Sequence, residues 1–199
     1  YLDKAEQIAK QYHDLKTITC VLCNNGKIFS DRQKYDTSLT LSLMGLKIAQ
    51  EEGFRQWEFV LLNNIGDLYY SMGRPEEAIP YLERAIKSDK DNMDPYYRNM
   101  AVVTLGEVYF NLGEYKKAEY YLQRSLALAR QFHIGRDLIA ANKSLATLYY
   151  KIGNYKKAFM HQLHYSEMKD SLMGKDVVEK IQDMELKYRT AEKDKELLL

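Results

Sequence analysis

The residues best suited to chemistry are two cysteines three positions apart, Cys20 and Cys23, in the stretch TITCVLCNN. Thiols at this spacing can bind a metal ion, form a redox-active disulfide, or lie on one face of a helix. They are the only cysteines of the chain, so a disulfide framework is excluded and the redox compartment stays undecided. Thiol or metal chemistry is therefore still open at this point.

A second pair of candidate ligands, His161 and His164, lies in the stretch HQLH, and its spacing allows both rings on one helical turn. Zinc needs further ligands, and no other histidine or cysteine is near this pair in the sequence. We interpret the histidines as surface or packing residues. Because the sequence has no recognisable nucleophile with its base and no phosphate-binding glycine loop, we predict no enzyme, no catalytic residue, no cofactor and no metal site.

The composition indicates a folded helical protein without a strong overall charge. Of 199 residues, 46% are hydrophobic, which suffices for a sizeable core, and 29 basic residues nearly balance 28 acidic ones. No global field then attracts nucleic acid or an anionic membrane. Only 3 prolines and 10 glycines disfavour an all-β fold with many turns. No run reaches the ~20 apolar residues of a membrane helix, and because Tyr1 begins in mid-pattern we expect a fragment of a longer protein.

The chain repeats itself every 40 residues. The stretch LNNIGDLYYSMGRPEEAIPYLERAI from Leu62 returns as VVTLGEVYFNLGEYKKAEYYLQRSL from Val102 and as NKSLATLYYKIGNYKKAFMHQLHYS from Asn142. The residues that recur in register are Gly66, Gly106 and Ala146; Tyr69, Tyr109 and Tyr149; Gly73, Gly113 and Gly153; and Ala78, Ala118 and Ala158. A small residue and a tyrosine share one helical face, a glycine ends that helix, and an amphipathic stretch follows. Each unit is therefore predicted to be a helical hairpin that buries its apolar face by stacking on the next.

Further copies extend the array toward the N-terminus. One step back from Gly66 reaches Gly26, with Phe29 in the tyrosine position, and another step aligns the first residues of the chain with second helices. We predict an all-α solenoid, with the third repeat's second helix breaking at Gly135. The predicted segments are the second helix of a truncated repeat at 1–17, four repeats at 18–57, 58–97, 98–137 and 138–168, and a capping or coiled-coil helix at 169–199.

These motifs resemble the tetratricopeptide repeat, in which a small pair, an aromatic residue and a glycine turn precede a second helix with alanines. The resemblance covers about residues 1–168 and implies a right-handed superhelical solenoid of hairpins. Two features depart from the family pattern: the terminal proline is missing, and the tryptophan-like position holds Leu22, Leu62, Val102 and Asn142. The 40-residue step exceeds the common ~34 residues and is similar to a variety found in bacterial regulators and scaffolding adaptors.

The resemblance also implies where a partner would bind. In the family, four positions of each first helix line the concave face. In this sequence they are Val60, Asn63, Asp67 and Tyr70; Met100, Val103, Glu107 and Phe110; and Ala140, Lys143, Thr147 and Tyr150. With Asn64 and Asn111 as further hydrogen-bonding groups, we predict a groove for a protein or peptide.

Two alternatives concern this groove. Tyr70, Phe110 and Tyr150 would form an aromatic ladder in it, but they could instead pack between neighbouring helices. The carboxylate-binding subtype of the family is not matched, because Asp67 and Glu107 would repel an anion. In this register, Cys20 and Cys23 occupy groove positions of the degenerate first repeat, so ordinary helical spacing explains them.

The last part of the chain follows a different pattern. Val177, Ile181, Met184, Tyr188 and Ala191 have the alternating spacing of a narrow apolar seam on one long helix. It could cap the last repeat or form a coiled-coil or dimer helix. The sequence from MKDSL onward also resembles the connector of bacterial membrane-anchored tetratricopeptide regulators, in which exported repeats lead through one membrane span to a DNA-binding or histidine-kinase output.

We therefore predict a non-enzymatic protein- or peptide-binding module that serves as the sensor or interaction region of a bacterial signalling or transcription regulator. The alternative is an assembly scaffold that forms a homodimer through residues 175–199. We expect no nucleic acid partner for this part of the protein and a membrane link only through parent segments outside it. The connector resemblance implies a periplasmic location, with a cytoplasmic one as the alternative.

Overall fold

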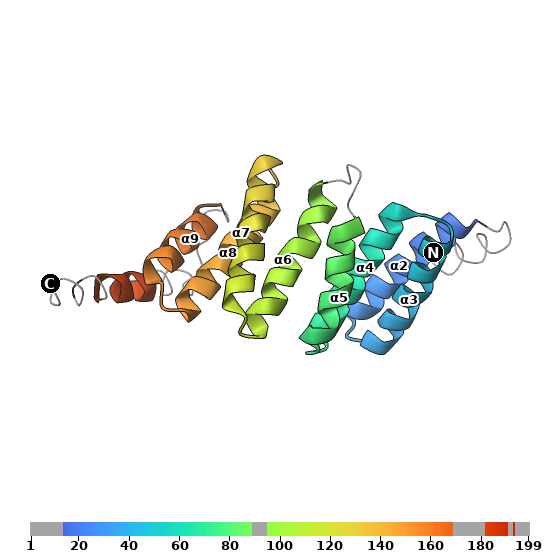
Figure 1. Ribbon diagram of the computed structural model, residues 1–199, viewed down its shortest axis with the longest axis horizontal. Helices are drawn as coiled ribbons and strands as arrows, with labels where there is room; N and C mark the ends of the chain where they lie inside the picture. Colours follow the sequence, from blue (N-terminus) through green and yellow to red (C-terminus); the bar gives the residue numbers. More distant parts are fainter. Residues whose placement is uncertain (1–13, 89–94, 169–181, 191–192, 194–199) are drawn as a thin grey trace. The chain divides into compact units, whose positions relative to one another are not determined.

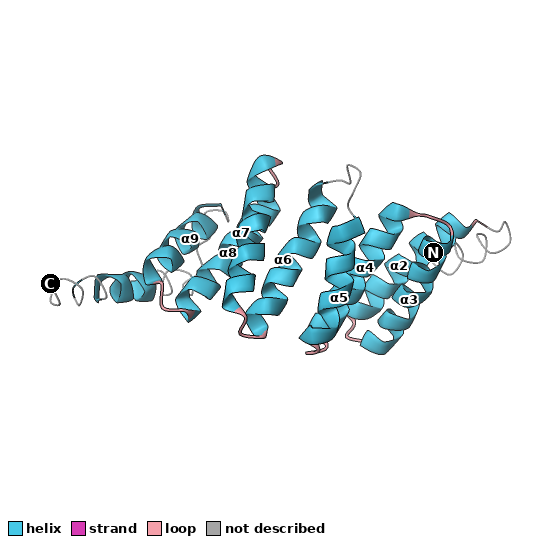
Figure 2. Cartoon of the chain, in the orientation of Figure 1, coloured by secondary structure: helices cyan, strands magenta, loops and turns pink. Residues whose placement is uncertain are grey.

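The computed structural model describes residues 14–88, 95–168, 182–190 and 193. Throughout these residues the chain forms helices joined by short turns, and no strand occurs among them (Figure 2). The predicted all-α class is confirmed. The helix predicted at 1–17 lies almost wholly outside the described residues, as do residues 169–181 and most of 191–199 of the predicted C-terminal helix.

Eight labelled helices follow one another as hairpins (Figure 1). Their bounds are α2 (Leu15–Asp31), α3 (Tyr35–Glu51), α4 (Arg55–Ser71), α5 (Pro75–Ser88), α6 (Pro95–Asn111), α7 (Tyr115–Gln131), α8 (Gly135–Lys151) and α9 (Tyr155–Met168). Helix α2 packs on α3, α4 on α5 and α8 on α9, and each second helix α3 and α7 also contacts the first helix that follows it. The chain divides into two compact units, the N-terminal unit up to Val108 and the C-terminal unit from Tyr109.

The helix starts are evenly spaced along the sequence. Leu15, Tyr35 and Arg55 open α2, α3 and α4, and every later helix also begins 20 residues after its predecessor. The hairpins begin at 15, 55, 95 and 135, three residues before the predicted repeat boundaries at 18, 58, 98 and 138. The difference arises because the predicted boundaries are counted from the recurring glycines and tyrosines, which lie in the second half of each first helix and do not mark where that helix begins. At Leu15, for example, the helix start is set by Asp14, whose side chain accepts a hydrogen bond from the Thr17 backbone at 3.1 Å.

The turns between helices share one backbone conformation. The residue two positions after the helix end has a positive φ at Gly53, Gly73, Gly113, Gly153, Gln33 and His133. After α6, Gly113 N–H donates to the Phe110 carbonyl at 3.0 Å and Glu114 N–H donates to the Tyr109 carbonyl at 2.9 Å, the bond pair of a Schellman motif. The predicted break at Gly135 is wrong, because α7 ends at Gln131, His133 makes the turn, and Gly135 begins α8.

The close packing of each hairpin depends on small residues. Ala78, Ala118 and Ala158 are fully buried on the second helices. At Gly66 of α4 an added Cβ would lie 2.5 Å from Cγ of Leu82, a buried residue of α5, so only glycine permits this approach of the two helices. The same position of the last repeat holds Ala146, which is 1% exposed.

Each of the last three hairpins also contains the same ring arrangement. The buried tyrosine of the first helix stacks on a ring of the second helix, at centroid distances of 5.5 Å for Tyr69–Tyr81, 5.6 Å for Tyr109–Tyr121 and 5.4 Å for Tyr149–His161. A cation lies over each of these tyrosines, at 5.0 Å for Arg74, 4.8 Å for Lys117 and 4.6 Å for Lys157. Such contacts contribute roughly 0.5–1 kcal/mol each at partly exposed sites.

The cation comes from two different positions. In the second hairpin Arg74 pairs with Glu77 at 2.5 Å, whereas the third hairpin has the reversed pair, with Lys117 2.5 Å from Glu114. The two pairs occupy equivalent positions 40 residues apart. Exchanging the signs of the pair therefore leaves a cation over the tyrosine in both hairpins.

Among the described residues, no helix is both long and apolar enough to span a membrane.

Candidate functional site

The N-terminal unit has a hollow of about 310 Å³ on its first helices. The described residues that line it all belong to α2, α4 and α6, the first helices on which the groove was predicted. Its lining residues are Cys23, Asn24, Lys27, Gln56, Trp57, Val60, Asn64, Tyr97 and Met100.

The 40-residue register explains this lining. Trp57 and Tyr97 occupy the same position of successive first helices, as do Val60 and Met100, and so do Asn24 and Asn64. The predicted groove positions that line the hollow are those of Cys23, Val60, Asn64 and Met100. The prediction missed Trp57 and Tyr97, one helical turn nearer the helix start, and the signal that could have found them is that two large aromatic residues recur 40 positions apart.

Charged and polar groups lie in the hollow and close to it. Asn64 donates a hydrogen bond to the sulfur of Cys23 at 3.4 Å. Lys27 contributes a positive charge to the lining. Asp67 lies close enough to Lys27 for the two charges to interact. Although Asp67 is exposed as a residue, partial desolvation by the surrounding protein raises the pKa of its carboxyl, and Lys27 acts in the opposite direction.

The thiols of Cys20 and Cys23 differ in environment. Cys23 is buried, and desolvation raises the pKa of its thiol from 9.0 to about 11, so it stays protonated at neutral pH. Cys20 is only partly covered and accepts a hydrogen bond from the Asn24 side chain at 3.4 Å. Within the described part of the chain both are free cysteines, and no group of three or more metal-binding side chains is found there.

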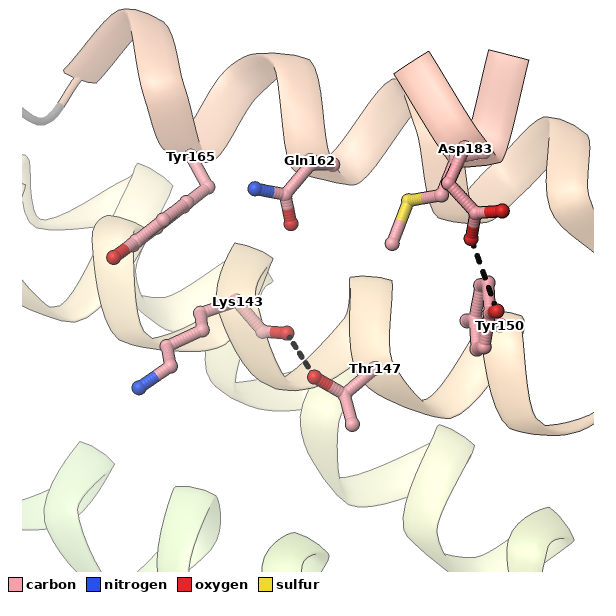
Figure 3. Close-up of a pocket in the computed structure, with 7 residues that line it drawn as sticks. Lys143, Thr147, Tyr150, Gln162, Tyr165 and Asp183 are labelled. Carbon is pink, nitrogen blue, oxygen red and sulfur yellow. Dashed lines mark hydrogen bonds between the residues drawn. The ribbon is translucent and has the colours of Figure 1, made fainter. Parts of the chain in front are cut away.

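The C-terminal unit has a second hollow, of about 340 Å³, beside α8 and α9. Three predicted groove residues, Lys143, Thr147 and Tyr150, line it from α8, and Gln162 and Tyr165 line it from α9 (Figure 3). The remaining lining residues, Asp183 and Met184, come from the helical segment 182–190.

The other predicted groove residues lie elsewhere in the structure. Asn63 is buried at 3% exposure and belongs to the lining of neither hollow. The same holds for the more accessible residues Tyr70, Val103, Glu107, Phe110, Asn111 and Ala140. The aromatic ring of Phe110 is 6.0 Å from that of Tyr115, and Tyr150 is 5.7 Å from Tyr155, so these two rings also pack against the second helix of their own hairpin.

Inside the C-terminal unit a polar cluster joins α7, α8 and α9 around Tyr149, which is 1% exposed. Its hydroxyl donates to Glu119 at 2.6 Å and accepts from Gln123 at 3.0 Å, and Lys157 lies 3.3 Å from both Tyr149 and Glu119. The hydrogen bond from Tyr149 is the main reason that the pKa of Glu119 is lowered, whereas desolvation is the main cause of the raised pKa of Tyr149. Because its members satisfy one another, we assign this cluster to the packing of the three helices.

His161 belongs to the same cluster. Its ring stacks on Tyr149, and Nδ1 lies 2.9 Å from Oδ1 of Asn142. The Asn142 amide nitrogen donates to the Leu138 carbonyl, which leaves Oδ1 facing the histidine as acceptor. Desolvation first, and then the positive charges around it, lower the pKa of His161 from 6.5 to about 4. The histidine is thus neutral at physiological pH and acts as a packing residue.

Comparison with known proteins agrees with this architecture. The sequence matches the tetratricopeptide repeat family over residues 17–91 and 97–171. Comparison with curated protein sequences gave no significant match. Among solved structures, BtubC (BKLC) from P. vanneervenii superimposes with a TM-score of 0.73 at 15% identity, covering 99% of this chain and 87% of its own.

Two further solved structures have the same fold. A putative kinesin light chain from Podosopora anserina, with nearly identical TPR-like repeats, has a TM-score of 0.69 at 13% identity over 89% of this chain and 90% of its own. YrrB has a TM-score of 0.54 at 17% identity over 97% and 98% of the two chains. Repeats of this kind build protein-interaction modules, and the helix pairs, the turn glycines and the family match agree that this chain belongs to the tetratricopeptide repeat family.

Proposed function

We propose that the hollow of the N-terminal unit binds a peptide segment of a protein partner. The observation that carries this proposal is the lining itself, in which Trp57, Tyr97 and Met100 provide apolar surface beside the amides of Asn24 and Asn64. Aromatic side chains and methionine supply the buried area of many protein interfaces, and side-chain amides can pair with both the N–H and the C=O of a bound backbone.

Charge and structural similarity add to this proposal. Lys27 and the nearby Asp67 have opposite charges, so the hollow does not favour a strongly acidic or strongly basic peptide. The solved structure of YrrB, which has the same fold, is described as that of a TPR protein with an unusual peptide-binding site. The comparison supports peptide binding as a function that this fold can carry.

The test uses Trp57, which is the only tryptophan of the chain and lines the hollow. Peptides selected on the protein from a library of short random sequences should change the Trp57 emission on binding. Tyr97→Ala should weaken that binding by about tenfold or more, the loss expected for an interface anchor. The control Tyr120→Ala removes a tyrosine that is 62% exposed and outside the hollow, and should bind like the wild type.

Two results would contradict the assignment. One is that no selected peptide alters the Trp57 emission. The other is that Tyr97→Ala and Tyr120→Ala bind the selected peptides equally well while both variants keep the helical circular dichroism of the wild type.

We further propose that this module is the sensor or interaction region of a bacterial signalling or transcription regulator. The similarity of the C-terminal segment to the connector of membrane-anchored regulators supports this role. The sequence of the parent gene tests it: a regulatory output domain beyond Leu199 is expected, and a parent without any output domain would contradict it.

The alternative, a scaffold that forms a homodimer through residues 175–199, receives less support from the described part of this segment. Met184, a residue of the predicted seam, is 7% exposed because it packs against its own chain. Sedimentation of the chain with and without residues 175–199 distinguishes the dimeric scaffold from the regulator's sensor or interaction region. A dimer that depends on this segment would favour the scaffold.

A further inference from the structure

The helical segment 182–190, called the docked segment below, contacts the hollow of the C-terminal unit through both polar and apolar groups. The Tyr150 hydroxyl donates a hydrogen bond to Asp183 at 3.1 Å (Figure 3). Lys187 donates to the same hydroxyl and to Asp183, and its Nζ lies 4.4 Å from the centroid of the Tyr150 ring. Met184 is 7% exposed and lines the hollow.

These contacts lie on one side of the docked segment. Residues 183, 184, 187 and 188 share a helix face by their spacing, and Lys156 of α9 lies 5.8 Å from the ring of Tyr188 on that face. Leu186 points away from this face and is 65% exposed. The segment is therefore an amphipathic helix that presents an acid, an apolar residue and a lysine to the hollow.

The hollow is only partly filled by this helix. Within 182–190, Met184 is the one buried side chain, and the polar contacts of Asp183 and Lys187 are exposed to solvent. About 340 Å³ of space remains between the docked segment and the residues of α8 and α9. Because the described residues 182–190 hold this position through one buried side chain and two solvent-exposed polar contacts, the segment has the features of a weakly held ligand.

We propose that this hollow is a docking site for an amphipathic helix, that residues 182–190 occupy it in cis, and that a partner helix with the pattern acid, apolar, two other residues, lysine can replace them. The docked segment itself supplies the evidence for the ligand chemistry, since each feature of the pattern has an observed contact. This proposal extends the interaction role to a second surface and does not depend on peptide binding at the hollow of the N-terminal unit.

The experiment measures competition between the docked segment and the same helix supplied in trans. The probe is a fluorescein-labelled peptide of residues 176–193, longer than the ~12–15 residues below which isolated helices are marginal. Its anisotropy is followed on titration with the full chain, with Met184→Asp, and with the matched control Leu186→Asp. The two substitutions add the same charge to the same helix and differ in whether the side chain they replace is buried.

Met184→Asp should bind the probe at least about tenfold more tightly than the wild type, because releasing the cis helix removes its competition. Leu186→Asp should bind like the wild type, and a probe that itself carries Met184→Asp should bind none of the proteins. Should Met184→Asp lose helical circular dichroism, the double variant Asp183→Ala/Lys187→Ala replaces it, because both side chains are exposed and outside the repeats. Equal affinity of all variants for the probe, or no binding to a folded released variant, would overturn the proposal.

Discussion

Acid should weaken the last repeat through one histidine. His161 takes the place of Tyr81 and Tyr121 in the ring arrangement, and its imidazole is held between Tyr149 and Asn142. The charged or chargeable groups that influence it are His164, Arg130 and Lys157, and all of them disfavour its protonation. Replacing His161 by tyrosine, the residue of the other hairpins, should remove this sensitivity while keeping the stacked ring.

The direction and size of the effect follow from the two pKa values. The folded-state pKa of His161 is about 4, against 6.5 for the free side chain, so between these values the unfolded state binds the proton and the folded state does not. The free energy of unfolding is therefore highest above pH 6.5 and falls as the pH drops toward 4. The loss is at most about 2 kcal/mol at pH 5 and about 3 kcal/mol below pH 4, and solvent access to the partly exposed ring reduces both values.

Urea unfolding of wild type and His161→Tyr, at pH 7 and at pH 5, measures this effect. Carboxyl groups such as Glu119 titrate in both proteins and affect both in the same way. The difference in unfolding free energy between variant and wild type therefore changes with pH only through the histidine. Between pH 7 and pH 5, the unfolding free energy of the variant should rise by about 1–2 kcal/mol relative to that of the wild type. In parallel, the imidazole signals of His161 in NMR spectra should titrate with a midpoint near 4.

A midpoint near 6.5, or a stability difference that does not change with pH, would refute this reasoning. Either result would mean that the ring of His161 is open to water in solution. The stacking on Tyr149 would then have to be weaker than the 5.4 Å centroid distance indicates.

Two further predictions concern the turns and the thiols. Gly113→Ala should destabilise the protein by about 1 kcal/mol, because Gly113 has a φ of +76°. Gly135→Ala, at the start of α8, should be neutral or stabilising. An added Cβ meets no atom within 4 Å at either site, so the thermal unfolding of the two variants compares the backbone effect alone. A thiol reagent at neutral pH should modify Cys20 before Cys23, because Cys23 is 5% exposed and has a pKa of about 11; peptide mapping after partial reaction checks this order, and equal labelling of the two thiols would contradict it.

Much of the fold could be predicted because repetition averages out local ambiguity. The glycines at 73, 113 and 153 recur with the tyrosines before them, and three aligned copies identify the hairpin where one copy would not. The turns at Gln33 and His133 were not predictable from residue type, because only a few per cent of non-glycine residues have a positive φ. Their positions follow only from the 20-residue interval between turns, which becomes visible once the helices are known.

The candidate site was less predictable because a helix position in the sequence does not fix how deeply a side chain is buried. Asn63 and Asn64 are neighbours in sequence, yet Asn63 is buried and Asn64 lines the hollow of the N-terminal unit. The contact between Met184 and the last repeat joins segments without any repeat relation. The apolar seam of the C-terminal segment indicated that Met184 would be buried, but it did not indicate which surface Met184 would contact.

The even spacing of helix starts restricts how a chain of this kind can change length during evolution. Deleting residues 55–94 would join the turn after α3 directly to α6, so a first helix would again follow a second helix. Deleting half that length would put a second-helix sequence in a first-helix place, with its buried alanines directed to the wrong neighbours. A change by a whole helix pair therefore keeps first and second helices in alternation, but it also replaces part of the binding surface, since deleting residues 55–94 would remove Gln56, Trp57, Val60 and Asn64 from the lining of the hollow.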